Sequence, residues 1–253
     1  MALKTPKTTV HLGRKSLQTT NNVKVIYDAL STYYGPVRWQ PRYDGISELI
    51  FTVLTQHTSD QNAERAFQKL VDYYRIATYP DWIKVANASV ENIEPLIRSG
   101  GLSNIKAQRI KDILLHILHR YSSFNLDFLK ELPLEEAKQI LGKLPGVGPK
   151  TTAVVLCFAF GMPAFPVDTH IHRVTKRLGL ITSKTSADQA HTKLEKIIPP
   201  RLIFPFHVYL ITHGRQICKA RKPLCASCPV NIKCPSSTDT STFRFSRPTK
   251  VVQ

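Results

Sequence analysis

The sequence predicts an all-α fold, and three observations support that class. Apolar residues recur every three or four positions through most of the chain, as they do along the buried face of a helix. No segment shows the sustained apolar–polar alternation of a strand, and no segment repeats another. In the middle of the chain, Pro145-Gly146-Val147-Gly148 forms a tight turn between two apolar segments. The expected centre is therefore a helix, a glycine hairpin and a second helix.

The composition is that of a globular protein with a polyanionic partner. The chain has 253 residues, 42% of them hydrophobic, which is enough to bury a core as one large domain or two small ones. Its 35 lysines and arginines against 18 acids give a net charge of +17. Nucleic acid is the commonest partner of such a chain, and a solvated basic surface without a partner is the alternative. No apolar run approaches the roughly 20 residues of a membrane span, so no membrane is expected.

Before the hairpin, the sequence predicts a basic tail followed by helices. Residues 1–22 carry basic residues and no acid, which predicts a flexible tail, with an organellar transit peptide as the alternative. A short helix is expected over 22–34. A buried helix should begin at Asp44 or Ser47, and Asp60 is placed to cap the next helix.

Two irregular segments interrupt the helices before the hairpin. A polar junction precedes Asp60 and includes Gln56 and His57. A glycine turn ending at Leu102 precedes a long helix whose apolar face runs from Ile110.

After the hairpin, capping residues mark the start of a helix. Gly148 is the expected N-cap and Pro149 the first helical residue, because proline has no amide hydrogen to leave unpaired there. That helix is expected to continue to Gly161. Further helices and a disordered tail are expected over 169–178, 187–198, 206–217 and 236–253.

Lys150 and Asp168 are the candidate catalytic residues. The positive end of the helix dipole disfavours a charged ammonium group in the first turn of a helix. The neutral amine form of Lys150 is therefore expected to be favoured. Such an amine can act as a nucleophile and form a Schiff base, and an ordinary surface lysine is the alternative. The seven residues from Gly161 to Asp168 can span up to roughly 23 Å, which is enough to bring the carboxylate back beside the lysine. Asp168 is also a good N-cap, and the two roles are compatible.

Four of the five cysteines lie near the C-terminus, at Cys218, Cys225, Cys228 and Cys234. Four thiolates in so short a loop can bind a zinc ion or an iron–sulfur cluster, and the residues alone leave both open. Buried or reactive cysteines without metal are the remaining alternative. Cys157 lies within an apolar helix and is expected in the core.

Three features together resemble the endonuclease III family of helix-hairpin-helix DNA glycosylases. They are the segment 144–150, the Val-Asp-Thr-His segment 167–170 and the spacing of the four C-terminal cysteines. The resemblance extends over about residues 25–236 of the chain. It implies two helical lobes with a DNA-binding cleft between them, formed by residues 45–160 and by residues 23–44 with 161–235.

The resemblance also implies an activity. The implied enzyme is a bifunctional DNA glycosylase and AP lyase of base excision repair. Its expected substrates are damaged pyrimidines, in particular oxidised ones. Lys150 would attack C1′ of the sugar and then cleave the strand by β-elimination, while Asp168 stabilises the cationic sugar and helps to activate the lysine. The alternatives are a glycosylase of the same fold for mismatched, alkylated or UV-dimer bases, and a DNA-binding protein without catalysis.

The cysteine spacing matches the family's [4Fe-4S] loop, which favours the cluster over zinc. The expected partner is double-stranded DNA that contains damaged bases or abasic sites, bound by a monomer. The expected location is the cytoplasm or nucleoid of a bacterium or archaeon, or the nucleus or an organelle of a eukaryote.

Several residues match positions that contact DNA in the family. Leu102 matches a leucine that wedges into the base stack, although a core leucine is the alternative. Asp60 matches a residue near the extruded base. Relatives usually carry glutamine three residues before that aspartate, whereas this chain has His57 there with Gln56 adjacent, which weakens the transfer of lesion preference. The residues expected at phosphates are Gly146, Val147 and Gly148 of the hairpin and Arg221 and Lys222 of the cysteine loop.

Overall fold

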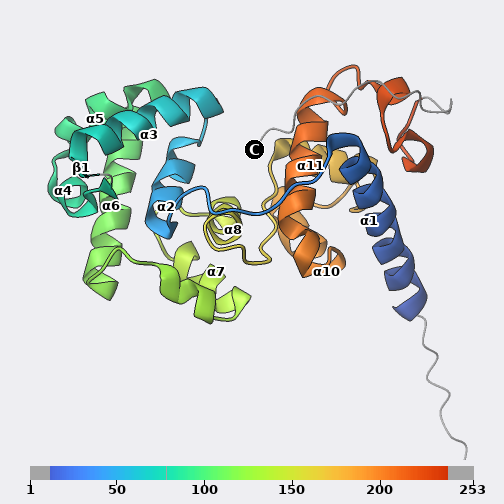
Figure 1. The fold of residues 1–253 in the computed structure, drawn as a ribbon, viewed down its shortest axis with the longest axis horizontal. Coiled ribbons are helices and arrows are strands. Elements are labelled where there is room, and N and C mark those ends of the chain that lie inside the picture. The colour runs from blue at the N-terminus through green and yellow to red at the C-terminus, as the bar shows by residue number, and fades with distance from the viewer. Residues whose placement is uncertain (1–11, 78, 239–253) are drawn as a thin grey trace, which may run out of the picture. The chain divides into compact units, whose positions relative to one another are not determined.

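A computed structural model describes residues 12–77 and 79–238, and these residues are mostly helical (Figure 1). The strands within this part of the chain are β1 (Arg75–Ile76) and β2 (Tyr79–Pro80), which pair antiparallel with Ile76 opposite Tyr79. The predicted all-α class is therefore confirmed. No helix among the described residues is long and apolar enough to cross a membrane.

The chain divides into two compact units. Arg38–Pro166 form the first unit, and the segments up to Val37 and from Val167 form the second. The first unit holds α2 (Gly45–Leu54), α3 (Asp60–Tyr74), β1, β2, α4 (Trp82–Asn87), α5 (Val90–Ile97), η1 (Arg98–Gly100), α6 (Ser103–Tyr121), η2 (Asp127–Glu131), α7 (Leu134–Gly142) and α8 (Pro149–Phe158). The second unit holds α1 (Leu12–Tyr34), α9 (Thr169–Arg177), α10 (Ala187–Ile197), η3 (Pro200–Leu202), α11 (Ile203–Gln216), η4 (Cys225–Ser227) and η5 (Asn231–Lys233).

Helix α2 is the central element of the first unit. All ten of its residues are buried, and it packs against both α3 and α8. Its N-cap is Asp44, whose side chain accepts a hydrogen bond from the Ser47 amide at 2.9 Å. The buried Glu48 is bonded by Arg42, so the one charge within this helix has its partner. Burial on every side explains why α2 has an apolar run rather than a single apolar face.

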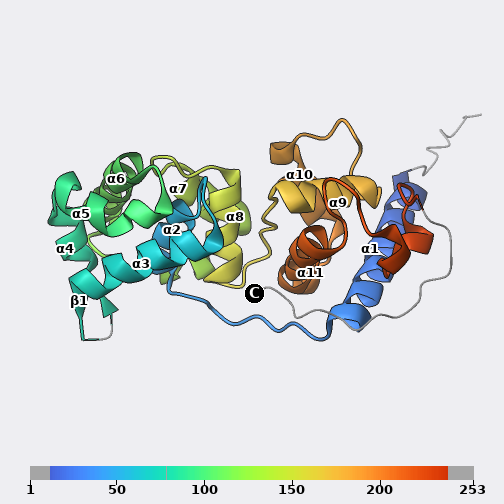
Figure 2. The ribbon, with the colours of Figure 1, turned by 90° about the horizontal axis from the view of Figure 1, so that it is seen from above.

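In the second unit, α9 packs against α11 (Figure 2). Gly214 of α11 allows the close approach, because an added Cβ would lie 2.9 Å from the Cβ of His170. The apolar face of α1 is buried through Val23, Ile26 and Leu30.

The structure corrects two local predictions. Helix α1 begins at Leu12 rather than near residue 22, so residues 12–22 of the segment predicted as a flexible tail are helical. Extension of a packed helix adds one hydrogen bond for each residue without a new nucleation cost, and the chain has no proline between Pro6 and Pro36. The other tail predictions, over 1–11 and 239–253, lie outside the described residues.

The second correction concerns the start of α3. Its N-cap is Ser59, whose hydroxyl accepts from the Asn62 amide at 3.3 Å, and Asp60 is the first helical residue instead. Both side chains suit a helix start, since a serine caps well and an acid is favoured in the first turn.

Candidate active site and cysteine cavity

The glycine hairpin lies between α7 and α8 and is built on two buried anchors. Leu144 and Val147 are 5% and 6% exposed and belong to the core of the first unit. The Val147 amide donates to the Leu144 carbonyl at 3.1 Å, which closes the turn. Val147 therefore packs inward and uses its amide within the hairpin, whereas Gly146 and Gly148 on either side are exposed.

Gly146 needs to be glycine for two reasons. Its φ of +69° lies in the left-handed region that side chains disfavour. An added Cβ would also overlap Nε of Arg109 and lie 2.6 Å from Cδ of that arginine. The arginine of α6 thus lies directly against the hairpin backbone.

Helix α8 starts as the sequence predicts, with Gly148 as N-cap and Pro149 at the first position. Lys150 follows and is exposed, whereas the next residue, Thr151, is 5% exposed. The first turn of α8 therefore directs one side chain outward and the next into the unit. Cys157, further along α8, is in the core as expected.

Gln56 is engaged at both ends of its side-chain amide. Its Oε1 accepts from Nη1 of Arg109 at 2.7 Å, and its Nε2 donates to Oγ1 of Thr151 at 3.3 Å. The sequence places Gln56 among residues that contact DNA, but its polar atoms are used within the protein. Its neighbour His57 is exposed and has a left-handed φ of 54°.

The turn before α6 presents a leucine to solvent. Leu102 is 54% exposed and has a φ of 50°, so the core alternative for this residue is excluded. Just beyond it, Lys106 is 1% exposed and donates hydrogen bonds to the carbonyls of Leu54 at 2.7 Å and Gly100 at 2.8 Å. Burial lowers the pKa of Lys106 to about 8, and the charge of Arg109 adds to that shift. Sequence patterning gave no sign of this residue, since a lysine on a helix normally faces water.

Asp168 is the N-cap of α9 and belongs to the second unit. Its Oδ1 accepts from the Ile171 amide at 2.7 Å, as the sequence predicts for a capping aspartate. The side chain is half-buried.

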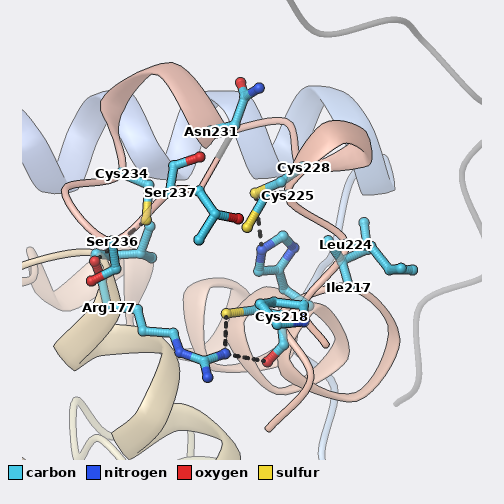
Figure 3. A pocket seen from close by; sticks show the side chains of 14 residues that line it. Arg177, Ile217, Cys218, Leu224, Cys225, Cys228, Asn231, Cys234, Ser236 and Ser237 are labelled. Atoms are coloured by element: carbon cyan, nitrogen blue, oxygen red, sulfur yellow. Dashed lines mark hydrogen bonds between the residues drawn. The ribbon is translucent and has the colours of Figure 1, made fainter. Parts of the chain in front are cut away.

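The four C-terminal cysteines line one cavity of about 190 Å³ (Figure 3). Two arginines of α9 hold the loop that leads into it. Arg173 Nε donates to the Cys218 carbonyl at 3.0 Å, and Arg177 donates to the carbonyls of Lys219 at 2.7 Å and Ala220 at 3.0 Å. Arg177 also lies 3.4 Å from the Cys218 sulfur, which places a fixed positive charge beside that ligand candidate.

A buried histidine lies behind the cavity. His213 Nε2 is 3.5 Å from the sulfur of Cys228, and its Nδ1 is 3.1 Å from the hydroxyl of Tyr34. Burial lowers the pKa of His213 to about 4, so its ring is neutral at pH 7. Burial also raises the pKa of the Cys228 thiol to about 12.

The four cysteine sulfurs are the candidate metal or cluster ligands of this cavity. Within the described residues, no three Cys, His, Asp or Glu side chains are arranged to hold a single metal ion. All four sulfurs nevertheless face the same space from four separate positions in the loop. The remaining loop residues of interest, Arg221 and Lys222, are exposed beside it.

Comparison with known proteins gives a consistent result. Residues 50–200 match the HhH-GPD superfamily of base excision DNA repair proteins. Endonuclease III of Thermotoga maritima is 37% identical over 191 residues, which are 76% of this chain and 83% of that protein. Endonuclease III of Escherichia coli is 36% identical over 186 residues, 74% of this chain and 81% of that protein. A solved structure of a trapped endonuclease III–DNA covalent intermediate is similar with a TM-score of 0.72 and 30% identity, over 86% of this chain and 96% of that one.

The helical fold and the glycine hairpin thus define a helix-hairpin-helix protein of base excision DNA repair. Within that class the chain belongs to the endonuclease III family, and it is a DNA glycosylase and AP lyase. Proteins of this broader family typically carry a [4Fe-4S] cluster.

Proposed function

We propose that this enzyme removes oxidised pyrimidines from double-stranded DNA and cleaves the strand through a Schiff base on Lys150. The observation that carries the proposal is an exposed lysine in the first turn of α8, directly after a hairpin with exposed glycines. The hairpin before α8 offers backbone amides to a phosphate of the DNA. The similarity to trapped and non-covalent endonuclease III–DNA complexes supports the same partner here.

In the proposed reaction, the side-chain amine of Lys150 takes part in both base removal and strand cleavage. Lys150 Nζ attacks C1′ of the damaged nucleotide while the bond from C1′ to the base nitrogen breaks, and the base leaves with that electron pair and takes up a proton. The new C1′ amine loses a proton, the C1′–O4′ bond opens and O4′ is protonated, which leaves a Schiff base. Removal of a C2′ proton then expels the 3′ phosphate by β-elimination. Water finally hydrolyses the imine and releases the lysine.

Asp168 has a supporting role in this proposal. Its carboxylate stabilises the positive charge that develops on the sugar and accepts a proton from the attacking amine. The N-cap hydrogen bond uses Oδ1, so Oδ2 is the oxygen that we assign to the reaction. The same aspartate thus starts α9 and serves the chemistry.

DNA contacts are assigned to exposed residues. Leu102 is placed on its turn to fill the space left by an extruded base, with Asp60 and His57 near that base. Phosphates are assigned to Gly146 and Gly148, because Val147 uses its amide within the turn. Two further phosphate contacts are assigned to Arg221 and Lys222. Since its substrate is DNA, the proposed location of the enzyme is a DNA-containing compartment of the cell.

The cysteine cavity is assigned to a [4Fe-4S] cluster held by Cys218, Cys225, Cys228 and Cys234. A tetrahedral zinc would draw the four sulfurs to about 2.3 Å from one point, whereas a cluster needs them spread around a larger cube. We expect a visible absorbance shoulder at roughly 400 nm, together with bound iron and sulfide. A colourless protein that contains zinc would contradict the assignment.

Borohydride trapping on duplex DNA with an abasic site tests the central proposal. The wild-type enzyme should form a covalent complex, and Lys150→Ala should form none while it still binds the duplex. Lys69→Ala, which removes an exposed lysine of α3, is the matched control and should be trapped normally. Equal trapping of Lys150→Ala and the wild type would refute the assignment. Cleavage of a panel of duplexes with oxidised, alkylated and mismatched bases then identifies the lesion class.

A further inference from the structure

Three side chains from distant parts of the first unit form one hydrogen-bonded chain beneath the hairpin. Arg109 of α6 donates to Gln56 at 2.7 Å, and Gln56 donates to Thr151 of α8 at 3.3 Å. We infer that Arg109, Gln56 and Thr151 are positioning residues that hold the first turn of α8 and thereby aim Lys150. The inference rests on the proposed role of Lys150 and adds to it.

Arg109, at one end of the Arg109–Gln56–Thr151 hydrogen-bond network, supports the hairpin backbone. The Arg109 side chain occupies the space in which a Cβ of residue 146 would stand, so it supports the left-handed turn from the protein side. Arg109 is half-buried, which makes it a support rather than a free surface cation. Its guanidinium is planar and held by Gln56, so its contact with Gly146 has a defined orientation.

The threonine end fixes the rotation of α8. Consecutive helical residues point about 100° apart, so a fixed and buried Thr151 determines where its neighbour Lys150 points. Gly148, the N-cap of α8, has no side chain, so no side-chain cap restrains this first turn. The hydrogen bond to Thr151 takes the place of that restraint.

Gln56 is the link because its amide carries both an acceptor and a donor. One polar end receives the arginine and the other reaches the threonine, which a hydrophobic or acidic side chain cannot do in the same way. This arrangement gives Gln56 a role within the protein in place of the direct DNA contact that its position in the sequence indicates.

Substitution of Thr151 tests the inference with closely matched variants. Thr151→Val keeps the shape and removes the hydroxyl, whereas Thr151→Ser keeps the hydroxyl. We would measure single-turnover strand cleavage at an abasic site with saturating enzyme, the dissociation constant for the same duplex, and the melting temperature. A misplaced nucleophile should slow cleavage by about tenfold or more in Thr151→Val with little change in binding, and Thr151→Ser should restore the rate.

A double-mutant cycle with Arg109→Met tests whether the residues act together. The variant that combines Thr151→Val with Arg109→Met should cleave about as slowly as the slower single variant, because each change breaks the same hydrogen-bond network. Arg75→Met, which removes an exposed arginine paired with Asp72, is the control and should cleave at the wild-type rate.

The outcomes separate this inference from the proposed function. If the wild type is trapped through Lys150 but Thr151→Val cleaves at the full rate, or if the two effects simply multiply, the positioning role is wrong and the nucleophile assignment stands. If Lys150→Ala is still trapped, the proposed function itself fails. A slowed Thr151→Val that Thr151→Ser does not rescue would also contradict the inference.

Discussion

Lys106 Nζ donates a 2.7 Å hydrogen bond to the carbonyl oxygen of Leu54, the last residue of α2. The same nitrogen reaches the carbonyl of Gly100, in the turn that presents Leu102. A buried cation thus binds the negative end of one helix and the turn before another, which ties α6 to both. The candidate DNA-wedge residue is therefore anchored to the core of its unit by a side chain that does not itself reach solvent.

Stability should depend on pH through Lys106. Its pKa is about 8 in the folded protein against an ordinary value of 10.5, so between these values the unfolded chain binds more protons than the folded one. The free energy of unfolding contributed by this group should therefore rise as the pH increases from 8 to 10.5. Urea unfolding of the wild type and Lys106→Met at several pH values measures the difference, which cancels the other titrating groups. Parallel stability curves for the two proteins would contradict the prediction.

Replacement of Leu102 should affect the stability of the protein and the rate of base excision independently. Leu102→Gly relieves the left-handed backbone strain and should stabilise the protein by about 1 kcal/mol, whereas Leu102→Ala keeps that strain. Both variants lose the wedge, so both should excise a damaged base more slowly. Cleavage at a preformed abasic site should change less, because no base has to be extruded. Wild-type excision by Leu102→Ala would exclude the wedge role.

Alanine at Gly146 should be costly. Gly146→Ala meets both the positive φ and the Arg109 side chain, so we expect a loss of more than about 1 kcal/mol in the free energy of unfolding. Gly142→Ala is the matched control: it lies near the end of α7, where an added Cβ meets nothing within 4 Å. That control should be neutral or slightly stabilising, because alanine is the better helix former. Similar unfolding curves for the two variants would show that the hairpin tolerates a side chain.

The cysteine loop should contribute to the salt dependence of DNA binding. Replacement of both Arg221 and Lys222 by alanine should reduce the slope of log affinity against log salt by about two, one for each phosphate contact. The matched control removes Lys69 and Arg75, which are exposed on the first unit. An unchanged slope in the loop variant would place these phosphate contacts elsewhere.

Arg177 should be needed to retain iron. Its guanidinium holds the carbonyls of Lys219 and Ala220 and lies beside the Cys218 sulfur, so Arg177→Met should loosen the loop and remove a favourable charge from a thiolate. We expect a lower iron content after dialysis against a chelator, measured per protein chain. Lys196→Met, an exposed change on α10, should keep the wild-type content. Equal iron in the two variants would exclude this supporting role.

Short stretches of the sequence were enough to predict several local features of this protein. The N-cap Asp168, the start of α8 at Pro149 and the burial of Cys157 all follow from residues within one or two helical turns, and the start of α2 is limited to Asp44 or Ser47. Capping and helical periodicity are short-range effects, so neighbouring residues are enough to predict them. The resemblance to the endonuclease III family also rests on short features, namely the segments 144–150 and 167–170 and the spacing of the four C-terminal cysteines.

Contacts between side chains that are far apart in the sequence depend on how the helices pack. Gln56 bonds Arg109 and Thr151 at separations of 53 and 95 residues, and Lys106 finds the Leu54 carbonyl 52 residues away. In sequence, Gln56 resembles a DNA contact and Lys106 a solvated helix residue. Their hydrogen-bond partners within the protein depend on how α2, α6 and α8 pack, and no short-range pattern records which buried polar groups that packing leaves to be satisfied.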